Sequence, residues 1–454
     1  MHTKNKFLTR KKAALTSILA RSLIVSLLVA SFATAADRPV IPAELTLKQA
    51  LDIALANSTA IREAQAGLDQ VTGRYEQSRS PRQPQINISM RQNLQTVNLI
   101  GIGIPIPGVT GKQGPFGSMD ARIFLSQELI NFANKRNWEG VRAEQDSSRF
   151  LVNDAREVVA LNVVSTYLEA LRMKATRNTL VEQVRLATDL YKLTRERVGQ
   201  GVAAELDAIR ALQPVNSLEQ QRLEAEQNYV AAKLNLANIL QATPSADFEV
   251  SDQSAYGSGM PPSKDEALQL ALMARFDYRS AEANVKAADL KRQSIKSTRY
   301  PTLRFQADDG QSGTTPVHNM NTYRIQGVVE LPVFTGGRIK AEEQELEALT
   351  RQAQVALDKS RSQIETDVLI AISGVEWAQK QVTASAENVK LSRQELDLSR
   401  ARFSQGVTDN TEVVNAQDRL SRADDAAIRA QFTLGLSRAN LARAIGVAET
   451  TYHK

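Results

Sequence analysis

The chain of 454 residues contains no cysteine and only three histidines. Without cysteine it forms no disulfide and no zinc site with thiolate ligands. His2, His318 and His453 are far apart in the sequence, and no two of them have metal-ligand spacing. We find no pairing of a nucleophile with a base, and no carboxylate pair that differs from ordinary helix-surface charge. We therefore expect a protein that is not an enzyme and that has no metal and no cofactor.

Nucleotide-binding motifs are missing as well. Gly101-Ile102-Gly103-Ile104-Pro105 starts like a dinucleotide fingerprint, but Pro105 and the lack of a following helix pattern argue against one. Gly111-Lys112 lacks the upstream glycine and the following Ser or Thr of a phosphate-binding loop. We interpret this stretch as a turn or surface loop.

The first 35 residues have the pattern of a secretory signal peptide. Six basic residues precede or enter a short apolar run that begins at Leu23, and Ala33-Thr34-Ala35 provides a small-residue cleavage site. A retained membrane anchor is disfavoured because the apolar run is much shorter than the ~20 residues that span a bilayer. The sequence contains no cysteine that could be acylated at the new N-terminus.

The signal peptide also accounts for the net charge. The full chain carries 56 basic and 50 acidic residues, and removing the six basic residues of the segment leaves 50 against 50. A nucleic-acid-binding domain needs a basic patch. We therefore expect no nucleic-acid partner.

The rest of the chain contains the same pattern twice. Ala50-Leu51-Asp52-Ile53-Ala54-Leu55 matches Ala267-Leu268-Gln269-Leu270-Ala271-Leu272 at an offset of 217, as 267 − 50 shows. Glu128-Leu129 matches Glu330-Leu331 at an offset of 202, and the later turns match at an offset of 205. We predict a first structural repeat over 36–242, a linker over 243–262 and a second repeat over 263–454. The linker is rich in Ser, Gly, Pro and Asp.

Each repeat is predicted to contain a helix, two strands, a very long helix, a turn and a medium helix. The opening helices are expected from about Thr46 to Ser78 and from about Lys264 to Lys296, each ending before a proline. The strands are expected at about 85–130 and 302–333. Residues 323–330 alternate between an apolar and a mostly polar face, as transmembrane β-barrel strands do. From the strands alone, a soluble hairpin resting on a core is an equal alternative.

Four strands are too few for a barrel, since the smallest bacterial barrels have about eight. If these strands span a membrane, several chains must share one barrel.

The long helices are predicted from the near absence of glycine and proline. Lys135 to Val198 contains only Gly140, and Arg338 to Phe403 contains only Gly374. At ~1.5 Å per residue each spans roughly 95–100 Å, more than the core of one domain. Pro214 lies in the returning helix of the first repeat and is expected to kink it. A helix seam with seven-residue spacing predicts left-handed supercoiling; it consists of Val368, Val375, Val382, Val389, Leu396 and Phe403.

The two long helices end in similar turns, predicted at 199–204 and 404–409. Arg197-Val198-Gly199-Gln200-Gly201-Val202 recurs as Arg402-Phe403-Ser404-Gln405-Gly406-Val407. Glycine in such turns relieves the strain of positive φ. The two turns are therefore expected to close two long helical hairpins.

This architecture resembles the TolC family of outer-membrane efflux proteins. The resemblance covers essentially the whole chain after the signal peptide, including the copy ends Asn235-Leu236-Ala237 and Asn440-Leu441-Ala442. Besides the doubled architecture, its most specific part is the stretch from Arg402 to Gln417. The fold implied is mainly α with a β part. A long α-helical coiled-coil barrel continues a transmembrane β-barrel of twelve strands, which three chains share.

The resemblance also implies function, partners and site residues. It implies a passive exit duct in the outer membrane, with its helical tunnel in the periplasm, serving a tripartite efflux or type I secretion system. The entrance constriction is implied at Glu412 and at Asn415, which replaces an aspartate of some members and makes its ring neutral. A periplasmic adaptor (membrane fusion) protein is expected to dock on the tips, at Gly199, Gln200, Gly201, Gln405, Gly406 and Val407.

The other implied partners are a second and third copy of the chain, outer-membrane lipid, and an inner-membrane pump of the resistance-nodulation-division or ABC type. A non-conducting periplasmic coiled-coil scaffold is the alternative. It explains the long helices and the signal peptide, but not the paired amphipathic strands at the same place in both repeats.

Overall fold

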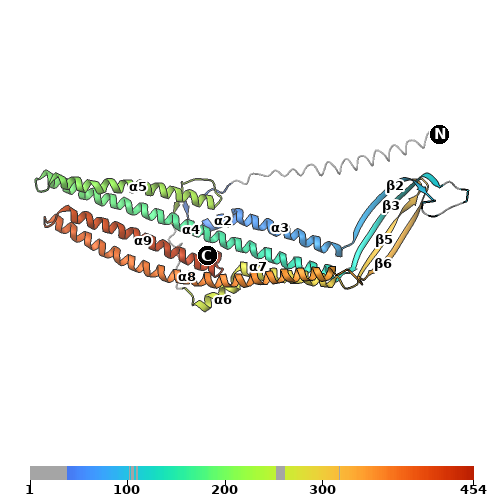
Figure 1. The fold of residues 1–454 in the computed structure, drawn as a ribbon. Helices are drawn as coiled ribbons and strands as arrows, with labels where there is room; N and C mark the ends of the chain where they lie inside the picture. The colour runs from blue at the N-terminus through green and yellow to red at the C-terminus, as the bar shows by residue number, and fades with distance from the viewer. Residues whose placement is uncertain are drawn as a thin grey trace, which may run out of the picture. The chain divides into compact units, whose positions relative to one another are not determined.

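The computed structural model describes residues 38–101, 103, 107–108, 111–251, 261–315 and 317–453. The predicted signal peptide, residues 102 and 104–105 of the glycine-containing loop, and the middle of the predicted linker lie outside these residues. The chain divides into residues 1–40 and 41–454, and every element below belongs to the second unit. This unit is mainly helical with a smaller sheet, which confirms the predicted mainly α composition with a β part (Figure 1).

Two uninterrupted helices form the frame of this unit. Helix α4 spans Phe132–Gly199 and helix α8 spans Arg338–Ser404, with 68 and 67 residues. Asn131 caps α4, since its side chain accepts a hydrogen bond from the backbone N–H of Asn134 over 3.0 Å. The other helices are α2 (Leu47–Asn57), α3 (Thr59–Arg79), the 3-10 helix η1 (Ser80–Arg82), α5 (Glu205–Ile239), α6 (Lys264–Ala274), α7 (Phe276–Ser297), α9 (Asn410–Ala444) and α10 (Ala448–Tyr452).

The helices lie side by side in a layer that is four helices wide. Near the sheet the order is α3, α4, α7, α8, and toward the helix tips it is α5, α4, α9, α8 (Figure 1). Helices α7 and α9 thus separate the two long helices along their length. The outer flanks of the layer belong to α8 on one side and to α3 and α5 on the other.

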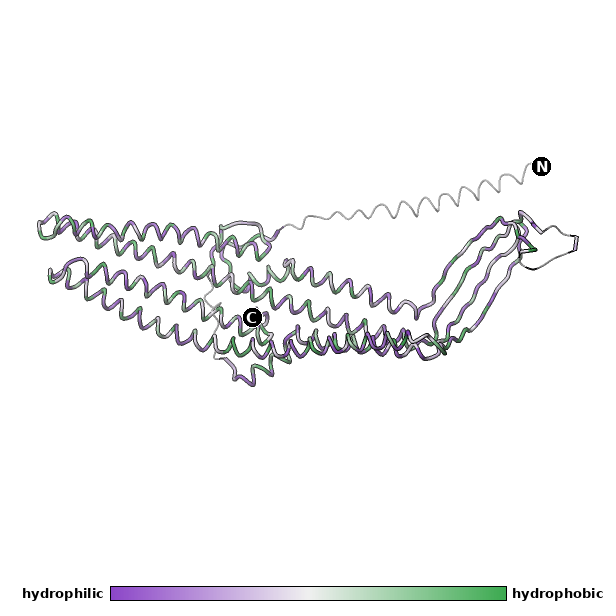
Figure 2. Tube along the Cα trace, in the orientation of Figure 1, coloured by the Kyte–Doolittle hydropathy of each residue, from purple (hydrophilic) through white to green (hydrophobic). Residues whose placement is uncertain are grey.

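Hydrophobic residues are distributed periodically along these helices. Hydrophobic and hydrophilic positions alternate along each long helix without a continuous apolar run (Figure 2). Among the described helices, none has the length and apolar composition that crossing a membrane requires. Pro214 lies inside α5, which continues on both sides of it although proline donates no backbone hydrogen bond.

The sheet consists of β2 (Gln85–Asn98), β3 (Lys112–Ile130), β5 (Thr302–Gly313) and β6 (Asn319–Glu330). Its order is β2-β3-β5-β6 and all neighbours are antiparallel. The predicted second strand pair extended to residue 333, whereas β6 ends at Glu330, shortly before Pro332. Strands β2 and β6 form the two edges of this sheet.

Register places apolar side chains on one face of all four strands. Ile86 lies opposite Leu125, Leu125 opposite Ala307, and Ala307 opposite Ile325. The side chains of this face are exposed or partly exposed in the chain, and Ile325 is 67% exposed. The opposite face is mostly polar, so the sheet is amphipathic over its full width. The apolar residues of this face are Ile86, Ile88, Met90, Ala121, Ile123, Leu125, Leu303, Phe305, Ala307, Tyr323, Ile325 and Val329.

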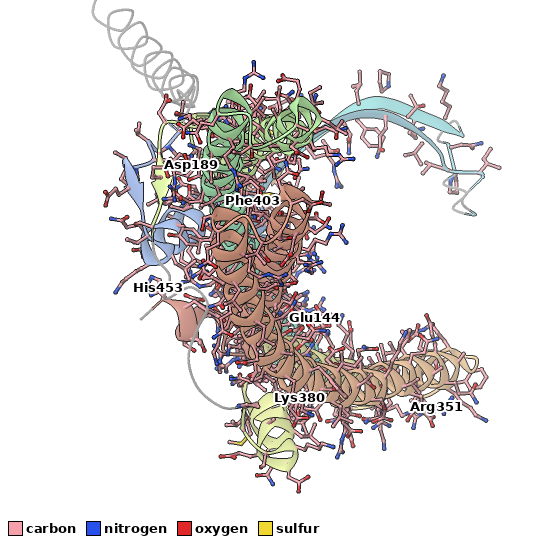
Figure 3. All side chains as sticks on the ribbon, turned by 90° about the vertical axis from the view of Figure 1, so that its left-hand side faces the viewer. Glu144, Asp189, Arg351, Lys380, Phe403 and His453 are labelled. Atoms are coloured by element: carbon pink, nitrogen blue, oxygen red, sulfur yellow. The ribbon has the colours of Figure 1, made fainter. Side chains whose placement is uncertain are left out.

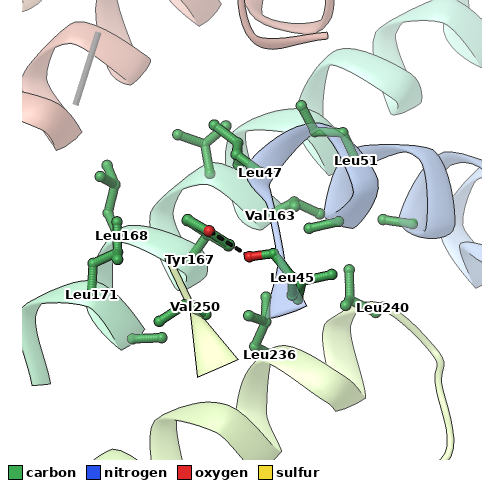
Figure 4. Close-up of a cluster of buried hydrophobic side chains, with 14 of the residues drawn as sticks. Leu45, Leu47, Leu51, Val163, Tyr167, Leu168, Leu171, Leu236, Leu240 and Val250 are labelled. Atoms are coloured by element: carbon green, nitrogen blue, oxygen red, sulfur yellow. Dashed lines mark hydrogen bonds between the residues drawn. The ribbon is translucent and has the colours of Figure 1, made fainter. Parts of the chain in front are cut away.

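The largest core lies midway along α4. There Tyr167 is fully buried, and its hydroxyl donates a hydrogen bond to the carbonyl of Leu45 over 2.7 Å (Figure 4). The short strands β1 (Glu44–Leu45) and β4 (Glu249–Val250) pair in parallel beside it. Strand β4 lies within the predicted linker, which is therefore not structureless. This core ties the start of the described chain to the segment between the two hairpins.

The predicted opening helices are each interrupted once. Ser58 separates α2 from α3 and Arg275 separates α6 from α7, with ψ angles of 129° and 122° that are not helical. Arg275 is buried, and its guanidinium contacts Asp277 at 2.6 Å and Asp367 at 3.0 Å. These two ion pairs hold Arg275 in its extended conformation, so α7 starts in a different direction from α6. Sequence periodicity alone did not reveal either interruption.

Candidate functional site

The tips of the two long helices end in geometrically matching turns. Gly201 has a φ of 74° and Gly406 a φ of 77°, both in the left-handed region. In each turn the glycine N–H and the next N–H donate to carbonyls three and five residues back, over 2.9–3.0 Å. This arrangement ends a helix with a left-handed residue, for which glycine has no steric penalty. The positive φ therefore explains the need for glycine at both positions.

The predicted docking residues surround these turns and are all exposed. Gln200 and Gln405 follow the last helical residue and keep helical φ angles of −84° and −80°. Gly199 is the last residue of α4 and is not among the positive-φ residues. Gly199 therefore relieves no positive-φ strain, because the chain reverses two residues later, at Gly201.

An arginine of the first tip holds the second. Arg197 donates from Nη1 to the backbone carbonyl of Phe403 over 2.6 Å. Its guanidinium carbon also lies 4.7 Å from the centroid of the Phe403 ring, which is a cation–π contact. Seen from the tips, Phe403 lies between the α4–α5 and α8–α9 hairpins (Figure 3). The two hairpins are thus joined at their ends within one chain.

A buried amide supplies a second link between the tips. Asn410, the first residue of α9, donates from Nδ2 to the carbonyl of Asp207 in α5 over 2.7 Å. Asn410 is buried, and its Oδ1 has no hydrogen-bond partner in the structure. Farther from the tip, Gln417 donates to the carbonyl of Leu186 over 3.2 Å. Buried polar links of this kind are costly to break, since each leaves an unsatisfied group behind.

A small apolar cluster lies under the turns. It is formed by side chains of α4, α8 and α9, so both hairpins contribute to it. Near it, burial raises the pKa of Asp424, while the nearby Gln183 and Arg393 oppose that shift. The buried members of the cluster are Leu190, Leu396, Phe403, Val413, Ala416 and Leu420.

Glu412 is held by three groups of its own tip. Its Oε2 accepts a hydrogen bond from the hydroxyl of Thr408 over 2.5 Å. Its Oε1 accepts one from Ser399 over 3.5 Å and lies 3.4 Å from Nη1 of Arg402. The carboxylate is thus half-buried and its charge is compensated by an arginine. Asn415 lies one turn farther along α9 and is exposed.

The structure places the predicted helix seam between neighbouring helices. Val368 and Val375 are buried in one core with residues of α9, and Leu396 and Phe403 are buried in the cluster under the tips. Val382 and Val389, between them, are partly buried. The seam therefore faces the interior of the four-helix layer of the chain itself.

Sequence reasoning overlooked the residues that join the tips. The offset of 205 relates Arg197 to Arg402 and Asp207 to Glu412, because 402 − 197 and 412 − 207 both equal 205. The paired residues nevertheless act differently. Asp207 accepts a hydrogen bond from the N–H of Ala204 over 3.2 Å and caps α5, whereas Glu412 contacts Arg402. The repeat in the sequence could have identified these positions as equivalent. It could not have shown that Asp207 caps a helix whereas Glu412 contacts an arginine.

Within the described part of the chain, no group of three or more His, Asp or Glu side chains is placed to hold a metal ion.

Comparison with known proteins identifies the family. The model of the outer membrane efflux protein family matches residues 50–241 and 267–447. The pyoverdine export outer membrane protein OpmQ of Pseudomonas putida is 24% identical, over 88% of this chain and 85% of that protein.

Solved structures agree in fold. The structure of CusC, described with transmembrane channel formation, superposes with a TM-score of 0.76 at 17% identity, over 92% of this chain and 95% of CusC. VceC of Vibrio cholerae gives 0.74 at 17% identity, over 88% of this chain and 96% of VceC.

Proteins of this family are channel and transport proteins of the outer membrane, not enzymes. The predicted outer-membrane location is confirmed, and membership argues against the alternative of a non-conducting scaffold. The chain belongs to the outer membrane efflux protein family, as its resemblance to TolC-like proteins predicted.

Proposed function

We propose that three copies of this chain form a passive exit duct through the outer membrane, built from two structural repeats per copy. Their sheets close a transmembrane barrel of twelve strands, and their helices continue it as a tunnel in the periplasm. The duct serves a tripartite efflux or type I secretion system. The observation that carries this proposal is that the sheet ends in two edge strands with one neighbour each, and the helical layer in flanks with exposed apolar residues.

The edge strands of the sheet support the proposal that three copies close one barrel. Strands β2 and β6 each have one neighbour in this sheet, and their outer edges carry backbone N–H and C=O groups without a strand partner there. A membrane-spanning sheet cannot leave such edges open to lipid, where each unsatisfied group is costly. Pairing β6 of one copy with β2 of the next satisfies both edges. The uncovered apolar face then contacts outer-membrane lipid.

The exposed flanks of the helical layer support the proposal that three copies close one helical tunnel. On α8 a second apolar stripe with seven-residue spacing lies beside the buried seam and is exposed, and Trp377 in it is 63% exposed. It consists of Ile370, Trp377, Ala384, Leu391 and Leu398. On the opposite flank, α5 exposes Ile209, Leu223 and Val230. Seven-residue spacing is the pattern by which helices supercoil around one another. Helix α8 of one copy therefore packs against α5 of the next.

Engineered cysteines test this closure, because the chain has none of its own. We expect a chain carrying both Ile209→Cys and Leu398→Cys to give a ladder that ends at three chains when oxidised in isolated membranes. These positions lie near the tips on opposite flanks, and α4 and α9 separate them within one chain. Each single-cysteine chain serves as a control. A doubly substituted chain that assembles in the outer membrane but yields no covalent trimer would refute the arrangement.

The tips are proposed to receive a periplasmic adaptor (membrane fusion) protein, itself attached to an inner-membrane pump of the resistance-nodulation-division or ABC type. Three copies present six tips, and in each tip the residues around the turn are exposed. Gly199, Gln200, Gly201, Gln405, Gly406 and Val407 make up the docking surface. The α8–α9 tip is proposed to move on opening.

Glu412 and Asn415 are proposed to line the tunnel entrance. We expect Glu412→Ala to increase the single-channel conductance of the purified protein in planar bilayers. The substitution removes the carboxylate that holds Thr408 and Arg402, so the α8–α9 tip loses contacts that fix its shape and the proposed entrance widens. Glu387→Ala, which removes an exposed carboxylate of α8 away from the tip, is the matched control. Equal conductance of Glu412→Ala and wild type would count against this role.

A further inference from the structure

We propose that the polar face of the sheet carries an arginine-dominated belt that favours anionic solutes in the outer part of the barrel. This inference rests on the proposed duct, in which the face opposite the lipid lines the lumen. The belt consists of Arg91 on β2, Asp120 and Arg122 on β3, Asp308 on β5 and Arg324 on β6. It therefore crosses all four strands, and its charges alternate in sign.

Arg122 is the centre of the belt. Its Nε donates to Asp120 over 2.7 Å, its Nη1 to Asp308 over 2.6 Å and its Nη2 to the hydroxyl of Thr322 over 2.7 Å. Every guanidinium nitrogen is thus engaged, and the side chain is only 17% exposed. The arginine lies along the wall of the sheet and joins β3, β5 and β6.

Glycine at position 310 lets the Arg122 side chain lie flat across strand β5. Gly310 is the register partner of Arg122 on β5. A Cβ at this position would lie 2.2 Å from the carbonyl oxygen of Ala121 and 2.6 Å from Cγ of Arg122. Neither distance is tolerable, so a side chain here would displace the arginine from the wall. Gly310 leaves the space through which Arg122 reaches Thr322 on the next strand.

The consequence is an unequal display of charge. Both carboxylates of the belt face Arg122, and the Asp308 side chain is largely covered. Arg91 is exposed at one edge strand, and Arg324 at the other is 67% exposed and lies 3.8 Å from Asp308. Three arginines against two aspartates give a net charge of +1 per chain. The Asp120 side chain is 39% exposed, so a solute at this level meets the two exposed guanidinium groups of Arg91 and Arg324 and one partly exposed carboxylate.

Charge nearer the helices has the opposite sign. There the same face carries Glu128 and Glu330 with Arg304, which is −1 per chain, and Arg304 lies 3.4 Å from Glu128. The wall thus changes from negative to positive toward its outer end. Fixed charges lining a narrow passage concentrate ions of opposite sign. Anionic groups such as carboxylates are the solute class that the outer level favours.

The test is the reversal potential of the purified full-length protein in planar bilayers under a KCl gradient. We expect the double variant Arg91→Gln with Arg324→Gln to lower the anion-to-cation permeability ratio by about threefold. The effect is modest because water weakens the attraction between a wall charge and an ion that passes a few ångströms from it. Arg324→Lys keeps the charge and is expected to keep the ratio.

Two neighbouring aspartates provide the matched pair. Asp308 lies on the polar face and Asp309, the next residue, on the apolar face opposite Tyr323. We expect Asp308→Asn to raise the ratio and Asp309→Asn to leave it unchanged. A double arginine variant with the wild-type reversal potential, or equal shifts at Asp308 and Asp309, would overturn the belt. A wild-type protein that forms no channels would instead overturn the duct itself.

Discussion

Gly406→Val is expected to reduce export to the level of a strain without the protein, while assembly in the outer membrane persists. The backbone of Gly406 has a φ of 77°, which a β-branched residue adopts only at a cost of roughly 1–2 kcal/mol or more. A Cβ there meets only Arg197 Nη2, at 3.7 Å, so the effect comes from backbone strain rather than from a clash. The turn must rearrange, and the proposed adaptor surface is lost with it.

Two glycine variants frame this result. Gly67→Ala is the matched control, because Gly67 is an exposed residue within helix α3, outside the docking surface, and a Cβ there would meet no neighbouring side chain within 4 Å. We expect it to export normally. Gly406→Asn is expected to retain part of the activity, since asparagine tolerates the left-handed region. Export is measured as cellular resistance or secretion in a strain that lacks the chromosomal copy, and abundance is measured in outer-membrane fractions. Normal export by Gly406→Val would contradict the docking role of the tip.

Ile325→Arg is expected to remove the protein from the outer membrane. Ile325 lies in the middle of the apolar face, and an arginine on the lipid side of a barrel costs about 2–4 kcal/mol near the bilayer midplane. The cost recurs in every copy of the proposed trimer.

Gln326→Arg is its matched control. Gln326 is the next residue on the same strand, but it lies on the polar face, where it donates to Gln306 over 2.7 Å. We expect this variant to assemble. The measurement is the amount of each variant in outer-membrane fractions and its shift on unheated gels. Equal loss of both variants would show that general damage to β6, and not contact with lipid, is responsible.

Local sequence patterns were sufficient to predict the long elements. The absence of proline and the single glycine in each long run predicted α4 and α8, and alternation of apolar and polar residues predicted the four strands. Both patterns extend over many residues, so each further residue supports the same assignment of helix or strand. The turns at Gly201 and Gly406 were predictable because positive φ strongly favours glycine.

Contacts between distant segments were not predictable in this way. The break at Arg275 depends on Asp367, which is 92 residues away, and the tip contact between Arg197 and Phe403 joins residues 206 apart. The terminal helix α10 is held by Glu157, whose carboxylate accepts a hydrogen bond from the N–H of Ala448 over 2.6 Å. Burial raises the pKa of Glu157, and these backbone hydrogen bonds oppose the shift. The residues adjacent to each of these partners in the sequence do not indicate the contact.

The core around Tyr167 lies far from the tips along helix α4. From Tyr167 to Gly199 the uninterrupted helix α4 extends 32 residues, which is about 48 Å at 1.5 Å per residue. A rotation of about 5° at the core therefore displaces the tip by about 4 Å. That displacement exceeds the reach of the hydrogen bond from Arg197 to Phe403. A rotation of this size would break the Arg197 contact, and parting the hairpins would also require breaking the hydrogen bonds of Asn410 to Asp207 and of Gln417 to Leu186.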